Sequence, residues 1–180
     1  GRMPAWRGEG APLELAELVE IIATCRKQDI NGIIISMLHA YQSPAHEDAV
    51  KNEIEHLAPD LFAFTSSEIW PVVREYERTT TTILNGYVHP RVTGYLTGLE
   101  DTLSDLGMPA PPLLTKSNGG LMRAETGKRN CVSMLLSGTA AGVTGACWLA
   151  RQAGNDRVLT LDIGGTSADM ALIIDGQPQF

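Results

Sequence analysis

The sequence has no cluster of basic residues. Its 14 lysines and arginines are outnumbered by 21 aspartates and glutamates, which gives a net charge of −7. Proteins that hold a phosphodiester backbone carry a basic stripe or patch on one face. We therefore expect no nucleic-acid partner.

The sequence also lacks a long apolar run. No segment approaches the roughly 18 to 20 consecutive apolar residues that cross a bilayer, and the opening GRMPAWRGEG has no apolar signal-peptide core. The 3 cysteines form no CxxC pair and stand near no histidine at zinc-finger spacing. These absences predict a cytoplasmic protein with no membrane partner.

An initiator methionine is missing as well. The chain starts at Gly1, and the hairpin-turn signal Asp175-Gly176 stands close to its other end. We expect a piece of a longer protein, truncated at both ends. The strand that pairs with the one before Asp175 is then expected beyond Phe180.

Hydrophobic periodicity predicts alternating helices and strands in the first part of the chain. Apolar residues recur at helical spacing over 12–28 and 44–57, whereas 32–38 and 61–65 are continuous apolar runs. Such runs are typical of strands buried on both faces of a parallel sheet. The alternation predicts an α/β protein in which helices flank a mixed sheet.

The remaining elements are expected after an irregular stretch that begins at Ser66. The pattern predicts a long helix over 84–106, strands at 113–116 and 132–136, and a turn at 117–120. A further helix over 137–154 is lined with glycine and alanine. Because each helical glycine costs about 1 kcal/mol, we expect close backbone packing to offset that cost.

The segment LTLDIGGTSADMALIIDG, residues 159–176, carries the most chemistry. Its apolar runs predict a β-hairpin, and its glycines allow consecutive backbone N–H groups to converge on an anion. Asp162 and Asp169, at the rims of the turn, suit a hydrated Mg²⁺ ion, which prefers oxygen ligands. The stretch therefore predicts a magnesium–nucleotide site, the alternative being a plain hairpin. The predicted phosphate-binding residues are Gly164, Gly165, Thr166 and Ser167.

The order of helix, turn and DxGGT hairpin over 137–175 is similar to the second phosphate hairpin of the actin, sugar-kinase and heat-shock-chaperone ATPase fold. The resemblance implies part of a two-lobed actin-like, ribonuclease H-like ATPase. The first phosphate hairpin of a sugar kinase is an alternative placement, although that hairpin opens its chain and this one closes it.

Five segments together resemble the hydantoinase/oxoprolinase family: LHAYQSPAHE, SSEIWPVVREYERTTTTILNGYV, KSNGGLM, LSGTAAGV and LDIGGTSADMALI. Thr139 stands where the family usually has proline, and Ala168 where it usually has threonine. The resemblance implies that 1–75 is the C-terminal part of the family's N-terminal region. Residues 76–180 would be the N-terminal part of the hydantoinase A domain, with the phosphate hairpin at 158–175.

The resemblance also implies an activity. Members open cyclic amides such as hydantoin or 5-oxoproline with ATP and Mg²⁺, and work with a hydantoinase B-type partner subunit in an oligomer. Asp162 and Asp169 would be the catalytic, magnesium-ordering residues. The opposing phosphate hairpin and the adenosine pocket would lie outside 1–180, so this piece alone should be inactive. The alternatives are a non-catalytic nucleotide-sensing or assembly module, an ATP-dependent ketone carboxylase subunit, and a sugar or acetate kinase relative.

Other residues are weaker candidates. Asn118 and Gly119 in SNGG, and Arg78 in REYERTTTT, are possible substrate contacts, although a plain turn and a solvated charged face explain them too. A metal site at His39 and His46 is less favoured than a loop and helix cap. Cys131 is a weak nucleophile candidate because the sequence places no general base beside it.

Overall fold

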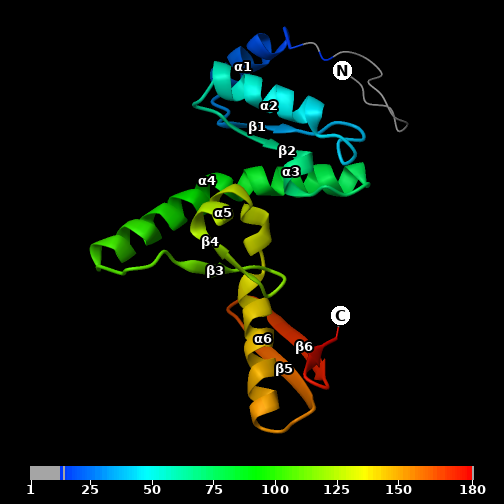
Figure 1. Cartoon of the computed structure of the whole chain (residues 1–180), viewed down its shortest axis with the longest axis vertical. Coiled ribbons are helices and arrows are strands. Elements are labelled where there is room, and N and C mark those ends of the chain that lie inside the picture. The colour runs from blue at the N-terminus through cyan, green and yellow to red at the C-terminus, as the bar shows by residue number, and fades with distance from the viewer. Residues whose placement is uncertain (1–12, 14, 180) are drawn as a thin grey trace. The chain divides into compact units, whose positions relative to one another are not determined.

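The computed structural model describes residue 13 and residues 15–179 as a mixed α/β chain (Figure 1). The chain divides into two compact units, residues 1–90 and 91–180. Helix α4 (Glu75–Asp105) runs through the boundary between them. The described strands fall into three small sheets, one parallel and two antiparallel, instead of the single mixed sheet that the sequence predicts.

The first unit has the predicted alternation of helices and strands. Its elements are α1 (Leu18–Lys27), β1 (Gly32–Ile35), α2 (Ala45–Leu57), β2 (Phe62–Thr65) and the short α3 (Ser66–Ile69). Strands β1 and β2 pair in parallel, from Gly32 opposite Phe62 to Ile35 opposite Thr65. The parallel pairing is therefore confirmed, while the predicted helix residues 12 and 14 lie outside the described part of the chain.

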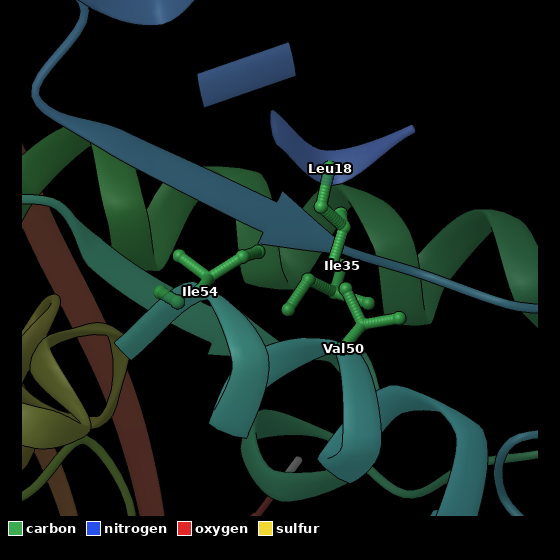
Figure 2. Close-up of a cluster of buried hydrophobic side chains, with 5 residues drawn as sticks. Leu18, Ile35, Val50 and Ile54 are labelled. Carbon is green, nitrogen blue, oxygen red and sulfur yellow. The ribbon is translucent and has the colours of Figure 1, made fainter. Parts of the chain in front are cut away.

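The apolar faces of these elements form the core of the first unit. Leu18 of α1, Ile35 of β1, and Val50 and Ile54 of α2 point toward one another (Figure 2). Each is less than a tenth exposed, and Ile54 is fully buried. Burial of such side chains contributes about 1.5–3 kcal/mol each. The core therefore holds α1 and α2 against the strand pair.

Helix α4 begins well before the predicted residue 84, so the expected irregular stretch from Ser66 is confirmed only for 70–74 and is wrong elsewhere. Thr65 forms a capping box with Glu68 at the start of α3. Arg78 and Thr82 in the first part of α4 are fully buried. Tertiary contacts thus fix as helix a threonine-rich segment whose intrinsic helix propensity is low.

In the second unit, the last part of α4 is followed by a small antiparallel pair, β3 (Leu113–Thr115) and β4 (Leu121–Arg123). Helix α5 (Ala124–Arg129) and a 3₁₀ helix, Cys131–Met134, follow. The strand predicted at 132–136 is therefore wrong. A short apolar run does not distinguish a strand from a buried turn by periodicity alone.

Helix α6 (Ser137–Gln152) precedes a three-stranded antiparallel sheet of β5 (Arg157–Ile163), β6 (Ala168–Ile174) and β7 (Gln177–Pro178). The helix and hairpin agree with the prediction. Strand β7 pairs with β6 across a turn in which Asp175 and Gly176 both have positive φ, 52° and 69°. The partner of β6 after this turn is thus within the chain, contrary to expectation, because a two-residue turn needs only a short return strand.

The two faces of the β5–β6 hairpin differ. Val158, Thr160, Ala171 and Ile173 are buried or half-buried. The other face carries large apolar side chains that are exposed, namely Leu159, Leu161, Ile163, Met170 and Leu172. Strand alternation separates the two sets.

Candidate functional site

The β5–β6 hairpin places the two predicted aspartates directly opposite each other. Asp162 on β5 pairs with Asp169 on β6 in the strand register. The turn beyond them closes with a 2.9 Å hydrogen bond from the Gly164 N–H to the Ser167 carbonyl. Directly opposed like charges destabilise a strand pair. The hairpin therefore maintains a local concentration of negative charge that a cation would relieve.

Both aspartates line a cavity of about 220 Å³ within the second unit. Thr139, Gly142, Val143 and Ala146 of α6 also line this cavity, together with Thr160 of β5. The hydroxyl of Thr139 donates a hydrogen bond to Oδ2 of Asp169, at 3.2 Å. Asp169 is half-buried, whereas Asp162 is exposed. The apolar side chains of Leu161 and Met170 complete the lining, so the cavity combines the two carboxylates and two threonines with an apolar wall.

Several glycines of this region are not explained by packing or by a positive φ. Gly164 and Gly165 are not among the residues with positive φ, and a Cβ atom on Gly165 would meet nothing within 4 Å among the described residues. The same holds for Gly138, Gly142 and Gly145 of α6, so the expected close packing of this helix is wrong at its glycines. Open space beside glycine backbone is compatible with a ligand that approaches closely.

Helix α6 begins beside the cavity in an unusual way. Leu136 precedes its first residue with a left-handed backbone, φ 60°, and makes no side-chain capping hydrogen bond. The first N–H groups of a helix have no partner within the helix and carry a partial positive charge. The start of α6 therefore offers donors to an anion.

The residues present fit a hydrated magnesium ion. Mg²⁺ commonly binds through one or two carboxylates and keeps several waters, and the hairpin supplies one opposed carboxylate pair. Over residue 13 and 15–179, no group of three or more histidine, cysteine and acidic side chains is positioned to hold a metal. A fully protein-coordinated metal is therefore not indicated in that part of the chain, and the His39 and His46 hypothesis finds no such cluster.

The predicted substrate-side residues Asn118 and Gly119 form a tight turn elsewhere in the second unit. Asn118 Oδ1 accepts a hydrogen bond from the Gly120 N–H at 3.0 Å, and Gly119 has φ 79°. The turn packs beside Thr144 of α6, since a Cβ atom on Gly119 would come within 3.1 Å of its Oγ1. Neither residue lines the cavity that contains the two aspartates.

Arg78, the third predicted substrate contact, is fully buried in the first unit. Its guanidinium donates to Ser66 Oγ at 2.9 Å, to the Val72 carbonyl at 2.8 Å and to the Met37 carbonyl at 2.8 Å. These bonds tie α4 to the carboxyl ends of β1 and β2. A substrate contact by Arg78 stays a prediction, and its surroundings favour a structural role.

Glu47 shares the partners Ser66 and Met37 with Arg78, and the sequence did not predict this buried role for it. It is fully buried in α2, and its carboxylate accepts from the Met37 N–H, Ser66 Oγ, the Ser67 N–H and Ser67 Oγ at 2.6–2.8 Å. Such a set satisfies both carboxylate oxygens. The spacing of Glu47 gave no signal for these bonds, because its partners lie just after β1 and in α3, 10 to 20 residues away along the chain.

Cys131 is fully buried, and its Sγ donates to the Lys128 carbonyl at 3.3 Å. Burial raises the pKa of this thiol to about 11. A nucleophilic cysteine needs an accessible thiolate. The surroundings of Cys131 therefore suit a packed structural residue.

The family is indicated by two sequence profiles. The profile described as Hydantoinase/oxoprolinase matches residues 78–180, and that of the Hydantoinase/oxoprolinase N-terminal region matches residues 1–58. The first match covers more than half of the chain. This chain belongs to the hydantoinase/oxoprolinase family.

Individual relatives agree with that assignment. The chain is 31% identical to the caprolactamase subunit alpha of Pseudomonas jessenii over 100% of its own length and 26% of that protein. It is 30% identical to the 5-oxoprolinase of Saccharomyces cerevisiae over 82% of its length and 11% of that protein. The chain therefore spans about a quarter of one relative and about a tenth of the other.

The fold has a counterpart among solved structures. A nucleotide-free structure of acetone carboxylase, from work on ATP-dependent acetone carboxylation, superimposes with a TM-score of 0.77 and 30% identity. The match covers 90% of this chain and 23% of the acetone carboxylase chain. The family therefore includes cyclic-amide hydrolases and a ketone carboxylase.

No helix in the described part of the chain is both long and apolar enough to span a bilayer.

Proposed function

We propose that this chain is the part of an ATP-dependent cyclic-amide hydrolase that supplies one phosphate-binding hairpin of an actin-like ATPase fold. The observation that carries the proposal is the opposed pair Asp162 and Asp169, placed between a glycine-rich turn and the start of α6. The names of the caprolactamase and 5-oxoprolinase relatives support a cyclic amide as substrate. The acetone carboxylase relative, described as ATP-dependent, supports ATP.

Each part of the hairpin has a role in this proposal. The Gly165 N–H and the hydroxyls of Thr166 and Ser167 bind phosphate oxygens, whereas Gly164, whose N–H is held by the Ser167 carbonyl, contributes an unshielded backbone beside them. Asp162 and Asp169 would hold a hydrated Mg²⁺ ion through its waters. When bound, magnesium-ATP supplies an activated phosphoryl group for the amide oxygen, which makes ring opening favourable. The alanine at 168 adds no hydroxyl to this set.

The same proposal places the remaining parts of the active site outside this chain. The opposing phosphate hairpin, the adenosine pocket and a hydantoinase B-type partner subunit complete the active oligomer in the cytoplasm. Since the chain spans about a quarter of the caprolactamase subunit, the 180-residue piece alone is expected to be inactive. Asn118 and Gly119 remain proposed substrate contacts, and Arg78 is the least supported of the three.

The test uses the complete polypeptide with its partner subunit. ADP release should depend on hydantoin, 5-oxoproline or caprolactam, and Asp162→Asn should lower kcat by about 100-fold or more, because a preorganised charge is lost at the transferring phosphoryl. The exposed Asp101→Asn on α4 is the matched control and should keep wild-type turnover. Full turnover by Asp162→Asn would favour a non-catalytic nucleotide-sensing or assembly module instead.

A ketone carboxylase is the second candidate. The acetone carboxylase structure favours it, with 30% identity and a TM-score of 0.77. ATP consumption that requires acetone and bicarbonate, and that cyclic amides do not stimulate, would select this alternative. A response to a sugar or acetate alone would indicate a kinase relative.

A further inference from the structure

Two threonines of α6 use their hydroxyls differently. Thr144 Oγ1 donates to the Ala140 carbonyl at 2.9 Å, one turn back in the same helix. This bond is the usual one for a helical threonine. Thr139 instead donates across to the hairpin, to Oδ2 of Asp169 at 3.2 Å. The Thr139 hydroxyl therefore connects α6 with the hairpin.

The geometry limits what this hydroxyl does to Asp169. A threonine hydroxyl has one proton to donate, and that proton is directed to Oδ2. The other carboxylate oxygen, Oδ1, is left for a further donor. Thr139 and Asp169 both line the cavity that also contains Asp162. The hydrogen bond thus selects one orientation of the Asp169 carboxylate within the cavity.

The position of Thr139 in α6 suits such a role. It is in the first turn of a helix that begins at Ser137, where backbone N–H groups have no acceptor one turn back. The helix is long and its first turn is anchored beside the hairpin, so the hydroxyl is held at a fixed place.

We propose that Thr139 is a positioning residue that orients Asp169 toward the hydrated magnesium of a bound nucleotide. The inference rests on the proposed function, because it assigns Asp169 to magnesium. In this role the Thr139 hydroxyl acts through Asp169. Its loss should weaken magnesium-dependent nucleotide binding and leave magnesium-independent binding unchanged.

The experiment measures binding of ADP to the complete polypeptide by titration calorimetry, once with Mg²⁺ and once with EDTA. Thr139→Val, which keeps the shape and removes the hydroxyl, should weaken binding of magnesium-ADP by about tenfold, as is common for groups that orient metal ligands. Binding of ADP in EDTA should change less than about twofold. Thr139→Ser, which keeps the hydroxyl, should restore magnesium-ADP binding.

Thr144→Val is the matched control, because it removes a hydroxyl of the same helix that bonds only within that helix. It should leave magnesium-ADP affinity unchanged. If Thr139→Val does not fold, judged by circular dichroism, Thr139→Ala takes its place. Equal loss with Mg²⁺ and with EDTA, or failure of Thr139→Ser to restore binding, would overturn the positioning role.

Asp162→Asn distinguishes this inference from the proposed function. If Asp162→Asn abolishes the magnesium-dependent part of binding while Thr139→Val changes nothing, only the role of Thr139 is overturned. If neither substitution changes magnesium-ADP binding, the phosphate site itself is overturned, and the role of Thr139 with it. Loss in both variants, with rescue by serine, supports both proposals.

Discussion

Glu47 and Arg78 are fully buried groups of opposite charge that meet through the hydroxyl of Ser66. Ser66 Oγ accepts from Arg78 Nε at 2.9 Å and donates to Glu47 Oε1 at 2.6 Å. Both charged groups also bind Met37, Glu47 through its N–H and Arg78 through its carbonyl. The network fixes α2 and α4 at the carboxyl ends of the parallel strands.

Glu47→Gln should lower the free energy of unfolding by about 2–4 kcal/mol. The amide replaces one acceptor oxygen by a donor, so buried donors lose their partner and the charge of Arg78 loses its counterpart. Urea unfolding followed by circular dichroism measures the change. Glu55→Gln on the exposed side of the same helix should change stability by less than about 0.5 kcal/mol. Equal effects at the two positions would contradict the buried network.

Gly32→Ala should destabilise the first unit by about 2–3 kcal/mol, in the range of overpacking substitutions. A Cβ atom at Gly32 would overlap the ring of Phe62, its partner in the strand register. The ring is confined by Phe64 and His89, at centroid distances of 5.6 and 4.7 Å.

Gly94→Ala is the control for that substitution. An added Cβ at Gly94 of α4 meets nothing within 4 Å of the described residues. The change should therefore raise the melting temperature, since alanine is favoured over glycine in a helix by about 1 kcal/mol. If both substitutions lowered the melting temperature to the same extent, the overlap with the Phe62 ring would have no specific cost, and the predicted overpacking at Gly32 would be wrong.

Asp162→Asn should stabilise the 180-residue chain in EDTA. Relief of the directly opposed charges of Asp162 and Asp169 should contribute about 0.2–1 kcal/mol. Urea unfolding at neutral pH and low salt measures this gain, and Asp101→Asn should show none. Destabilisation by Asp162→Asn would mean that the carboxylate is needed for the hairpin itself.

Cys131 should make the stability depend on pH in the alkaline range. Its pKa is raised from 9.0 to about 11 by burial, so the folded state keeps the thiol protonated where the unfolded state forms a thiolate. The stabilising contribution is complete below pH 9 and is lost as the pH rises toward 11. The drop in the free energy of unfolding between pH 8 and 10.5 should be smaller in Cys131→Ala than in wild type.

Alkylation offers a second measure for the same residue. Iodoacetamide at pH 9 should label Cys131 in the folded chain at least about tenfold more slowly than in urea, because the thiolate is the reactive form. Rapid labelling of the folded protein would indicate an accessible thiol and would reopen the nucleophile hypothesis.

The sequence predicted the elements whose signals are local. The apolar run at Ile33, Ile34 and Ile35 predicted a strand of a parallel pair, and the apolar runs on either side of the GGTSAD turn predicted the hairpin. Local patterns also located Asp162 and Asp169, since residues at the two rims of a hairpin turn are neighbours by construction.

Features that depend on distant partners were missed. The first turns of α4 are helical because Arg78 and Thr82 are buried by other elements, which no local propensity indicates. The role of Glu47 depends on Ser66 and Ser67, from another element. Likewise, the contact of Thr139 with Asp169 needs the packing of α6 on the hairpin.

The alternation of β5 and β6 has a practical consequence for protein engineering. Leu159 and Leu172 are register partners, 65% and 45% exposed, and neither lines the cavity of the two aspartates. Threonine or lysine at these two positions would make the exposed apolar face of the hairpin more polar. The face that carries Val158, Thr160, Ala171 and Ile173 would stay unchanged. The solubility of the chain can therefore be changed on these two strands without altering the side chains that line the cavity.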